Sequence, residues 1–433
     1  MTAAIATEAE QDIKRNYRHN FLVNALDGAT YWFGYSFISP TIILPLYIIN
    51  FTSNPILIGL LPFLNSAGFL IPQLFTANFV ARAPVKKWFP VTLGFFSERI
   101  PVLLFPLTVL LFAKDRPELA LLTFFLLYAW YMIGAGLIII GWQDMIAKII
   151  PVERRGRFFG ITNFVGNATG ILGAGSVGWV LANYEFPQGF LFAFTAAAVL
   201  VLLSWVFISL TREPPVQSSQ PPVSQLDFLR SLPRVLRQDA NFSRYLAFQI
   251  LSAVSLMASG FLIVYAKETW NMPNAMAGGF IIALQIGQSV ANLLFGFISD
   301  QKGHKLTLEA CMLLGVASLG LAIVAGGPLW FYAVFFLRGM LLAGNMLSGM
   351  SIAMEFSSVE DRPTYMGMAN TLPGVAAAIA PLFGGWLASV AGYPLMFGLS
   401  AVVGLAGFAL LRWFVRDPRF HGLPPVTGAP VNN

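Results

Sequence analysis

The sequence predicts an all-α integral membrane protein with twelve transmembrane helices in two six-helix halves. Three observations lead to this fold class: the composition, the number of long apolar runs, and an internal repeat. The 433 residues are 57% hydrophobic and 11% charged, whereas about a quarter of the residues of soluble domains are charged. Such a composition is typical of a chain that lies mostly in lipid.

Twelve apolar runs can each cross the membrane as a helix, because about 20 helical residues span a hydrocarbon core of about 30 Å. They cover residues 20–49, 57–79, 89–112, 119–149, 158–181, 190–209, 245–266, 278–298, 307–324, 329–356, 366–390 and 395–414. Transmembrane strands need only about ten residues and alternate in polarity, so these runs favour helices. The first run follows basic residues as a signal peptide would, but it is longer and contains Asp27, so we expect it to be retained.

The basic residues predict the orientation. Of the 26 Lys and Arg, 21 lie in the two tails and in the loops of one face, Lys114, Arg116 and Lys267 lie on the other face, and Arg99 and Arg338 lie within helices. By the positive-inside rule both termini are cytoplasmic, and we expect a multi-pass protein of the cell membrane. The net charge of +6 therefore reflects topology, and we expect the lipid bilayer, but no nucleic acid, among the partners.

An internal repeat divides the chain. An alignment without gaps joins VERRGRFFGITNFVGNATGILGAGSVGW (152–179) to VEDRPTYMGMANTLPGVAAAIAPLFGGW (359–386), with seven identities at an offset of 207 residues. An offset near half the chain length predicts two similar halves. We expect a tail at 1–19, six helices within 20–209, a cytoplasmic linker at 210–244, six helices within 245–414 and a second tail at 415–433.

The linker contains TREPPVQSSQPPVSQ (211–225), whose Pro, Ser and Gln residues cannot form a packed core. In the following LDFLRSLPRVLRQD (226–239), four Leu can share one helix face while three Arg lie elsewhere. This pattern predicts a short amphipathic helix on the inner membrane leaflet, and a solvated linker is the alternative.

Several classes of site lack the residues they need. Cys311 is the only cysteine, which excludes an intrachain disulfide, and all three His lie in tails or a loop, away from any intramembrane metal or haem site. The sequence has no G-x-x-x-x-G-K-[ST] loop for ATP. We expect no metal, no cofactor and no enzyme activity, since an enzyme would need a nucleophile and a base within the helices.

Charged residues gather in GFISDQKGHK (296–305), between the eighth and ninth runs. In a chain of twelve helices and two halves, this loop resembles the major facilitator superfamily, whose loop signature is G-x-x-x-D-R-x-G-R-K. Gly296, Asp300, Gly303 and Lys305 match, and the two Arg are replaced, one of them by His304. The resemblance covers residues 20–415 and implies a secondary transporter with a central site that opens alternately to each side.

The resemblance also implies that this loop braces a cytoplasmic gate. Gly296 permits a close helix approach, Gly303 permits a tight turn, and Asp300 can face the free N–H groups of a helix start. In the family that start belongs to the fifth helix, here near Arg157 and Gly160, so we expect Asp300 to contact it. A charged turn that only sets topology is the alternative.

The corresponding loop of the first half, ANFVARAPVKK (77–87), has Ala81 in place of the Asp. At the repeat offset, Glu355 at the end of the tenth run corresponds to Lys148 at the end of the fourth. Glu355 can pair with His304 or Lys305. We therefore expect an electrostatic brace in the second half and none in the first.

Charged side chains at membrane depth indicate functional sites, because an unpaired charge there costs several kcal/mol. Asp27 lies inside the first run near Tyr31, and the resemblance implies that this helix lines the cavity. We expect Asp27 to bind a proton or the solute, with a buried structural acid as the alternative. Arg338 lies inside the tenth run and could bind an anionic group or pair with Asp27.

Glu98 and Arg99 are adjacent in the third run. Neighbours on an α-helix point about 100° apart, so the two side chains need not pair with each other. The third helix is peripheral in the family, and we therefore expect structural bridges from this pair to neighbouring helices. The sequence leaves their roles open.

Uncharged polar residues follow the same helix faces. Gln285, Gln288 and Asn292 share one face by their spacing. Together with residues from other runs they could line a cavity for a moderately polar or amphipathic solute, and hydrogen bonds between helices are the alternative role. The set comprises Tyr31, Tyr131, Asn163, Asn167, Gln249, Gln285, Gln288 and Asn292.

The sequence indicates the direction of transport only weakly. APLFGG (380–385) is close to the G-P-x-x-G-G pattern of helix five in family antiporters, but helix five itself reads GAGSVG (173–178), without Pro. From the resemblance we expect proton-coupled efflux of an amphipathic compound by a monomer. The alternatives are proton-coupled or facilitated uptake of a sugar or organic acid, and a sensor that keeps a transporter fold without transport.

Overall fold

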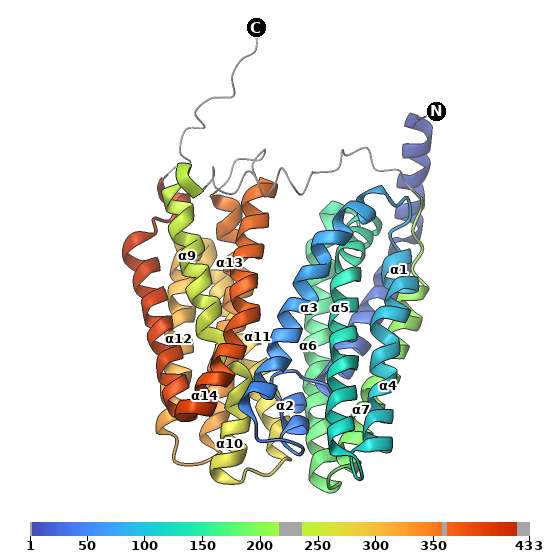
Figure 1. Cartoon of the computed structure of the whole chain (residues 1–433). Coiled ribbons are helices and arrows are strands. Elements are labelled where there is room, and N and C mark those ends of the chain that lie inside the picture. The colour runs from blue at the N-terminus through green and yellow to red at the C-terminus, as the bar shows by residue number, and fades with distance from the viewer. Residues whose placement is uncertain (1, 216–235, 357–361, 422–433) are drawn as a thin grey trace.

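The computed structural model describes residues 2–215, 236–356 and 362–421, and its regular elements there are helical (Figure 1). The first group comprises α1 (Thr2–Ser36), α2 (Ile43–Ile48), α3 (Pro55–Arg82), the π-helical segments η1 (Phe89–Leu93) and η2 (Phe95–Arg99), α4 (Ile100–Phe112), α5 (Pro117–Ile149), α6 (Val152–Asn183) and α7 (Gln188–Ser209). The second group comprises α9 (Ala240–Ser255), η3 (Leu256–Phe261), α10 (Leu262–Trp270), α11 (Met276–Lys302), α12 (His304–Val324), α13 (Trp330–Glu355), α14 (Arg362–Phe414) and α15 (Pro418–His421). Most of the predicted amphipathic segment 226–239 lies outside the described residues.

Ten of the described helical segments are long and apolar enough to cross a membrane, so the predicted count of twelve is not confirmed. The helix α1 is not among the ten, and its apolar part carries Asn20, Asn24 and Asp27. The helix α14 contains both of the last two predicted runs, with a break at Gly392, where φ is +82°. Glycine adopts this conformation without a Cβ clash, and α14 bends there into two arms (Figure 1).

Local signals explain where several helices begin. The side chain of Asn54 accepts a hydrogen bond from the Ile56 N–H at 2.9 Å, directly before α3. The Asp239 carboxylate likewise accepts from the Phe242 N–H at 2.8 Å, before α9. Such caps satisfy N–H groups that the first helical turn leaves free. Gly303, with φ of +86°, separates α11 from α12.

The helices form two bundles, α1–α7 and α9–α14, which stand side by side (Figure 1). We call the end of the molecule that holds the starts of α1 and α9 the proximal face, and the end that holds α2 and α10 the distal face. Gly303 and the C-terminal ends of α5 and α13 lie at the proximal face, as the alternating helix directions require.

The two bundles are joined near the distal face. The largest buried apolar cluster contains Ile43 and Tyr47 of α2 together with Phe261 of η3 and Val264 of α10, and so includes residues of both halves. Two smaller clusters at the proximal end each belong to one half. The buried core therefore connects the halves at one end of the membrane and leaves them separate at the other.

Candidate functional site

The candidate site lies where α6 and α11 diverge. The two helices touch near the distal face, where a Cβ on Gly278 would lie 2.3 Å from the Ala174 carbonyl oxygen. About one helical turn closer to the proximal face, a Cβ on Gly170 would lie 2.7 Å from Oε1 of Gln285. Near their proximal ends, a Cβ on Gly160 or Gly296 would have no neighbour within 4 Å. The space between the halves therefore widens toward the proximal face.

The amide side chains follow this widening space. Gln285 and Gln288 of α11 are partly buried, and Asn292, two turns later than Gln285, is exposed. On α6, Asn167 is partly buried and Asn163 is exposed. A helical face with this gradient of exposure is what a cavity open at one end produces.

Gln285 offers an unused acceptor. Its Oε1 is buried and has no hydrogen-bond partner among the described residues. A buried acceptor left without a donor costs about 1–3 kcal/mol, so a solute or water that donates to it gains that amount. Gln249 of α9 is partly buried, and its Nε2 would be 3.4 Å from a Cβ on Gly349 of α13.

An aromatic wall stands beside Gln285. Trp32 of α1 is 48% exposed, and its Cδ1 would lie 2.7 Å from a Cβ on Gly166, one turn from Gly170. Its ring packs edge-to-face against Tyr35 at a centroid distance of 5.5 Å. Trp32 and Gln285 thus meet the same helix one turn apart, where α1, α6 and α11 come together.

One of the two roles considered for Arg338, a pair with Asp27, is not formed in this conformation, because each side chain turns into its own half. Oδ1 of Asp27 accepts a hydrogen bond from Ser204 Oγ of α7 at 2.6 Å. Arg338 is buried, donates to Ser259 Oγ of η3, and lines a small interior space beside Ser400 of α14. Arg338 therefore does not face the space between the halves.

Glu98 and Arg99 form an ion pair with each other, Arg99 Nη1 to Glu98 Oε2, and Glu98 also bridges to a neighbouring helix, as expected. Both residues lie at the C-terminal end of η2. A π-helix has more residues per turn than an α-helix, so successive side chains are separated by a smaller angle. The Tyr31 hydroxyl donates to Glu98 Oε1 at 3.1 Å and lies 3.0 Å from the Tyr131 hydroxyl. Sequence reasoning missed this pair as site residues, although two adjacent charges inside an apolar run were a signal.

In the C-terminal half, Glu355 lies beside one other predicted gate residue, His304, and beside Arg419, which was not predicted. Nε2 of His304 lies 3.9 Å from Glu355 Oε1, and Nη2 of Arg419 lies 3.2 Å from the same oxygen. Lys305 pairs instead with Glu309 at 3.6 Å. Asp300 belongs to the last turn of α11, and its side chain lies outside the described part of the chain.

The N-terminal half also has an electrostatic brace, which corrects the expectation of none. Nζ of Lys148 lies 2.8 Å from Oε1 of Glu213, whose carboxylate also accepts the backbone N–H groups of Lys86 and Lys87 at 2.9 and 2.6 Å. The acid comes from the segment after α7 rather than from the loop 77–87. The sequence-based expectation considered only the loop 77–87, and therefore did not include Glu213.

Arg157 and Gly160, expected to meet the loop of α11, are exposed at the start of α6. With open space around Gly160 and Gly296, these two helix ends are not packed together in this conformation. The proximal face is thus the open one.

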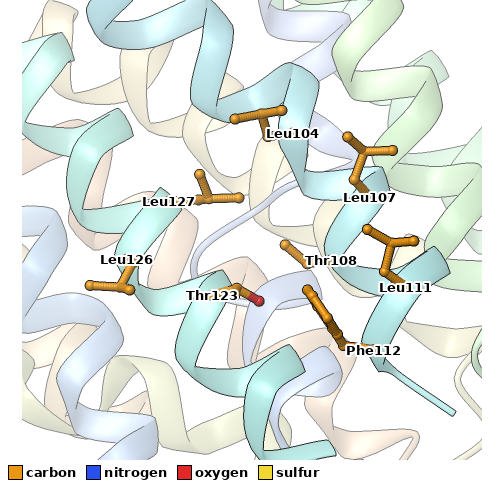
Figure 2. Close-up of a pocket in the computed structure, with 8 residues that line it drawn as sticks. All are labelled: Leu104, Leu107, Thr108, Leu111, Phe112, Thr123, Leu126 and Leu127. Carbon is orange, nitrogen blue, oxygen red and sulfur yellow. The ribbon is translucent and has the colours of Figure 1, made fainter. Parts of the chain in front are cut away.

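A separate apolar groove of about 260 Å³ lies between α4 and α5 (Figure 2). Six of its lining residues are Leu or Phe, and Thr108 and Thr123 supply its hydroxyl groups. Leu107, Leu111 and Leu126 are well exposed. The groove therefore belongs to the outer, lipid-facing wall and not to the space between the halves.

Comparisons with known proteins agree with this architecture. The sequence model of the Major Facilitator Superfamily matches residues 28–284 and again residues 245–430. The "Benzoate transport protein" of Acinetobacter baylyi is 23% identical over 185 residues, 40% of this chain and 38% of that protein. "Efflux pump apf11" of Gibberella fujikuroi is 28% identical over 127 residues, 29% of this chain and 22% of that protein. The aligned region thus spans less than half of each curated relative.

The fold has solved counterparts. A crystal structure of a mutant of the nucleoside transporter NupG superposes with a TM-score of 0.72 at 14% identity, covering 91% of this chain and 99% of that one. At such low identity the likeness concerns the fold alone.

Proposed function

Because the chain belongs to the Major Facilitator Superfamily, we propose that it exports a small amphipathic compound by alternating access in exchange for protons. Its family and fold make it a multi-pass membrane transporter rather than an enzyme. The substrate class, the direction and the proton coupling are the proposed part.

The observation that carries the proposal is the junction of α1, α6 and α11. There the half-exposed indole of Trp32 packs against Gly166, and the Gln285 amide, whose buried Oε1 has no hydrogen-bond partner among the described residues, packs against Gly170 one turn away. Asp27 and Arg338 are turned into their own halves. Aromatic rings and amides without a charged side chain among them favour an uncharged solute with one apolar and one hydrogen-bonding side.

Alternating access is supported by the unequal packing of the two faces. The halves share one apolar cluster at the distal face and have separate clusters at the proximal face. Rocking of one half against the other would move the contact from one face to the other. The basic loops favour cytoplasmic termini, and the two ends of the described chain lie at the proximal, open face (Figure 1). The present conformation would then open to the cytoplasm and could load a compound for export.

Uptake of a sugar or organic acid is the second candidate. The run of amides on α6 and α11 could serve hydroxyl or carboxyl groups, and one relative carries the name of a benzoate transporter.

A toxicity and growth screen over a compound library, in cells with and without the protein, would identify a substrate. Purified protein in vesicles with a pH gradient would then measure its flux. If the protein exchanges the compound for protons, vesicles that contain it should accumulate the compound while protons flow out of them down the pH gradient. If the vesicles accumulate the compound only when protons flow into them, exchange is refuted and proton-coupled uptake is supported. Gln285→Leu should weaken binding of the compound at least tenfold, while Gln238→Leu, outside the membrane-spanning helices, should not.

A further inference from the structure

Arg338 is a cation buried inside the C-terminal half, and none of the ion pairs among the described residues includes it. It belongs to α13 and is 4% exposed. A guanidinium has five N–H donors and keeps its charge in proteins, and here Nη2 donates to Ser259 Oγ of η3. A buried charge without a partner is strongly unfavourable at membrane depth. The guanidinium therefore needs a counter-ion that the described side chains do not supply.

A small interior space adjoins this guanidinium. Its volume is about 10 Å³, which holds about one water-sized particle. Two serines line it together with Arg338: Ser255 at the end of α9 and Ser400 of α14. The rest of the lining is apolar and consists of Met312, Gly315, Val316, Leu319, Leu341 and Gly404. The space thus lies among α9, α12, α13 and α14, and Arg338 is the charged residue of its described lining.

The size of the space restricts what can neutralise Arg338. An organic carboxylate or a phosphate is much larger than a water molecule and does not fit, and water itself carries no charge. A halide ion is little larger than water, carries the missing charge and accepts hydrogen bonds.

The two serine hydroxyls can also serve an anion. At present Ser255 Oγ donates to the Ser252 carbonyl oxygen at 2.8 Å, and Ser400 Oγ donates to the Ser255 carbonyl oxygen at 2.6 Å. A hydroxyl hydrogen rotates to suit its acceptor, so both groups can turn toward an ion beside Arg338.

The space lies next to an irregular part of the bundle. Ser255 directly precedes η3, the 3₁₀ segment between α9 and α10, and Ser259 within η3 accepts the hydrogen bond from Arg338. A 3₁₀ stretch inside a longer helix often marks a hinge. An ion at Arg338 would therefore connect α13 and α14 to this break.

We propose that Arg338, Ser255 and Ser400 form a binding site for one halide ion, chloride in the cell, inside the C-terminal half. The ion pairs with the guanidinium and fills the space beside it. It is not the transported solute, because Arg338 does not face the space between the halves. The site is therefore independent of the substrate and direction proposed above.

Thermal unfolding of the full chain in detergent tests the site without any solute. The protein is purified throughout in chloride or in gluconate at equal ionic strength, since gluconate is too large for the space. A ligand that binds only the folded state raises the unfolding midpoint, so the wild type should unfold several degrees higher in chloride. Arg338→Gln should have equal midpoints in both buffers. Arg116→Gln, which changes an exposed arginine at the distal face, should keep the shift.

Gly404→Ala is a second variant that retains the charge. Its Cβ would lie 3.1 Å from Val316 Cγ2 and 3.6 Å from Ser255 Cβ, two residues that line the space. The methyl group takes up part of the space, and binding of radiolabelled chloride to the purified protein should weaken at least tenfold. Gly398→Ala is the matched control on α14, because a Cβ there meets nothing within 4 Å, and it should bind chloride as the wild type does.

Two results would overturn the proposal: equal midpoints of the wild type in chloride and gluconate, or a chloride shift that persists in Arg338→Gln. In the first case the space takes a water molecule, and in the second the chloride acts elsewhere on the protein. If Arg338→Gln does not fold, undiminished chloride binding in Gly404→Ala overturns it.

Discussion

Nζ of Lys148 lies 2.8 Å from Oε1 of Glu213, and the Glu213 side chain is completely buried. The same carboxylate holds the backbone N–H groups of Lys86 and Lys87. One acid thus ties the end of α5, the loop before η1 and the segment after α7 together at the proximal face. In the other half, Glu355 at the end of α13 is paired with Arg419, which follows α14. In both halves a helix end is paired with the segment that follows the last helix of that half, but the helix end carries the base in the first half and the acid in the second.

Loss of the base in the first brace should destabilise the protein. Lys148→Met leaves a buried carboxylate without its cation, and removal of one partner of a buried pair costs about 3–5 kcal/mol. We expect the midpoint of thermal unfolding in detergent to fall by several degrees. Lys114→Met, an exposed lysine at the distal face, is the control. Equal midpoints for both variants would contradict a structural role for the pair.

Charge reversal in the second brace should impair conformational cycling. Glu355→Lys places a cation 3.2 Å from the position of the Arg419 guanidinium, and like charges repel. Proton-driven flux in vesicles should fall several-fold. The double variant Glu355→Lys with Arg419→Glu should restore most of it, because the pair is re-formed with exchanged charges. A double variant as slow as the single one would argue against this pair as the cause.

The closed distal face should depend on the small residues between α6 and α11. In Gly278→Val, the new Cβ would lie 2.3 Å from the Ala174 carbonyl oxygen, so this conformation is penalised relative to one with the distal face open. Labelling of Asn163→Cys by a thiol reagent from the proximal side should slow several-fold. The native Cys311 is buried and gives little background.

Gly175→Ala is the matched control on α6, since a Cβ there meets nothing within 4 Å. It should label as fast as the parent protein. Unchanged labelling in Gly278→Val would show that this contact does not hold the distal face closed.

Asp27 should be required for proton-driven transport but not for exchange. Asp27→Asn keeps a side chain that can meet Ser204 Oγ, now 2.6 Å from the carboxylate, but cannot take up a proton at neutral pH. We expect vesicles with the Asn variant to lose accumulation driven by a pH gradient while still exchanging labelled for unlabelled solute at equal pH. Ser204→Ala removes one hydrogen bond, worth about 1 kcal/mol, and should keep accumulation. If Asp27→Asn still concentrates the solute, the coupling group lies elsewhere.

The sequence by itself determined the membrane class and the two-half organisation, because these follow from run length and a constant repeat offset. It also identified the amides of α6 and α11, since their spacing alone places Gln285, Gln288 and Asn292 on one face. Such features are encoded within a few helical turns, or in the order of the chain.

The tertiary structure decided which partner each charged side chain takes. Glu98 pairs with Arg99 and accepts a hydrogen bond from Tyr31 of α1, Lys148 pairs with an acid 65 residues later, and Asp27 faces Ser204, 177 residues away, rather than Arg338. These choices depend on how helices rotate and pack against one another, and buried charges settle on the nearest group that offsets their desolvation. Periodicity within one helix does not contain that information, so neither the brace of the first half nor the hydrogen bond between Tyr31 and Glu98 could be located without the fold.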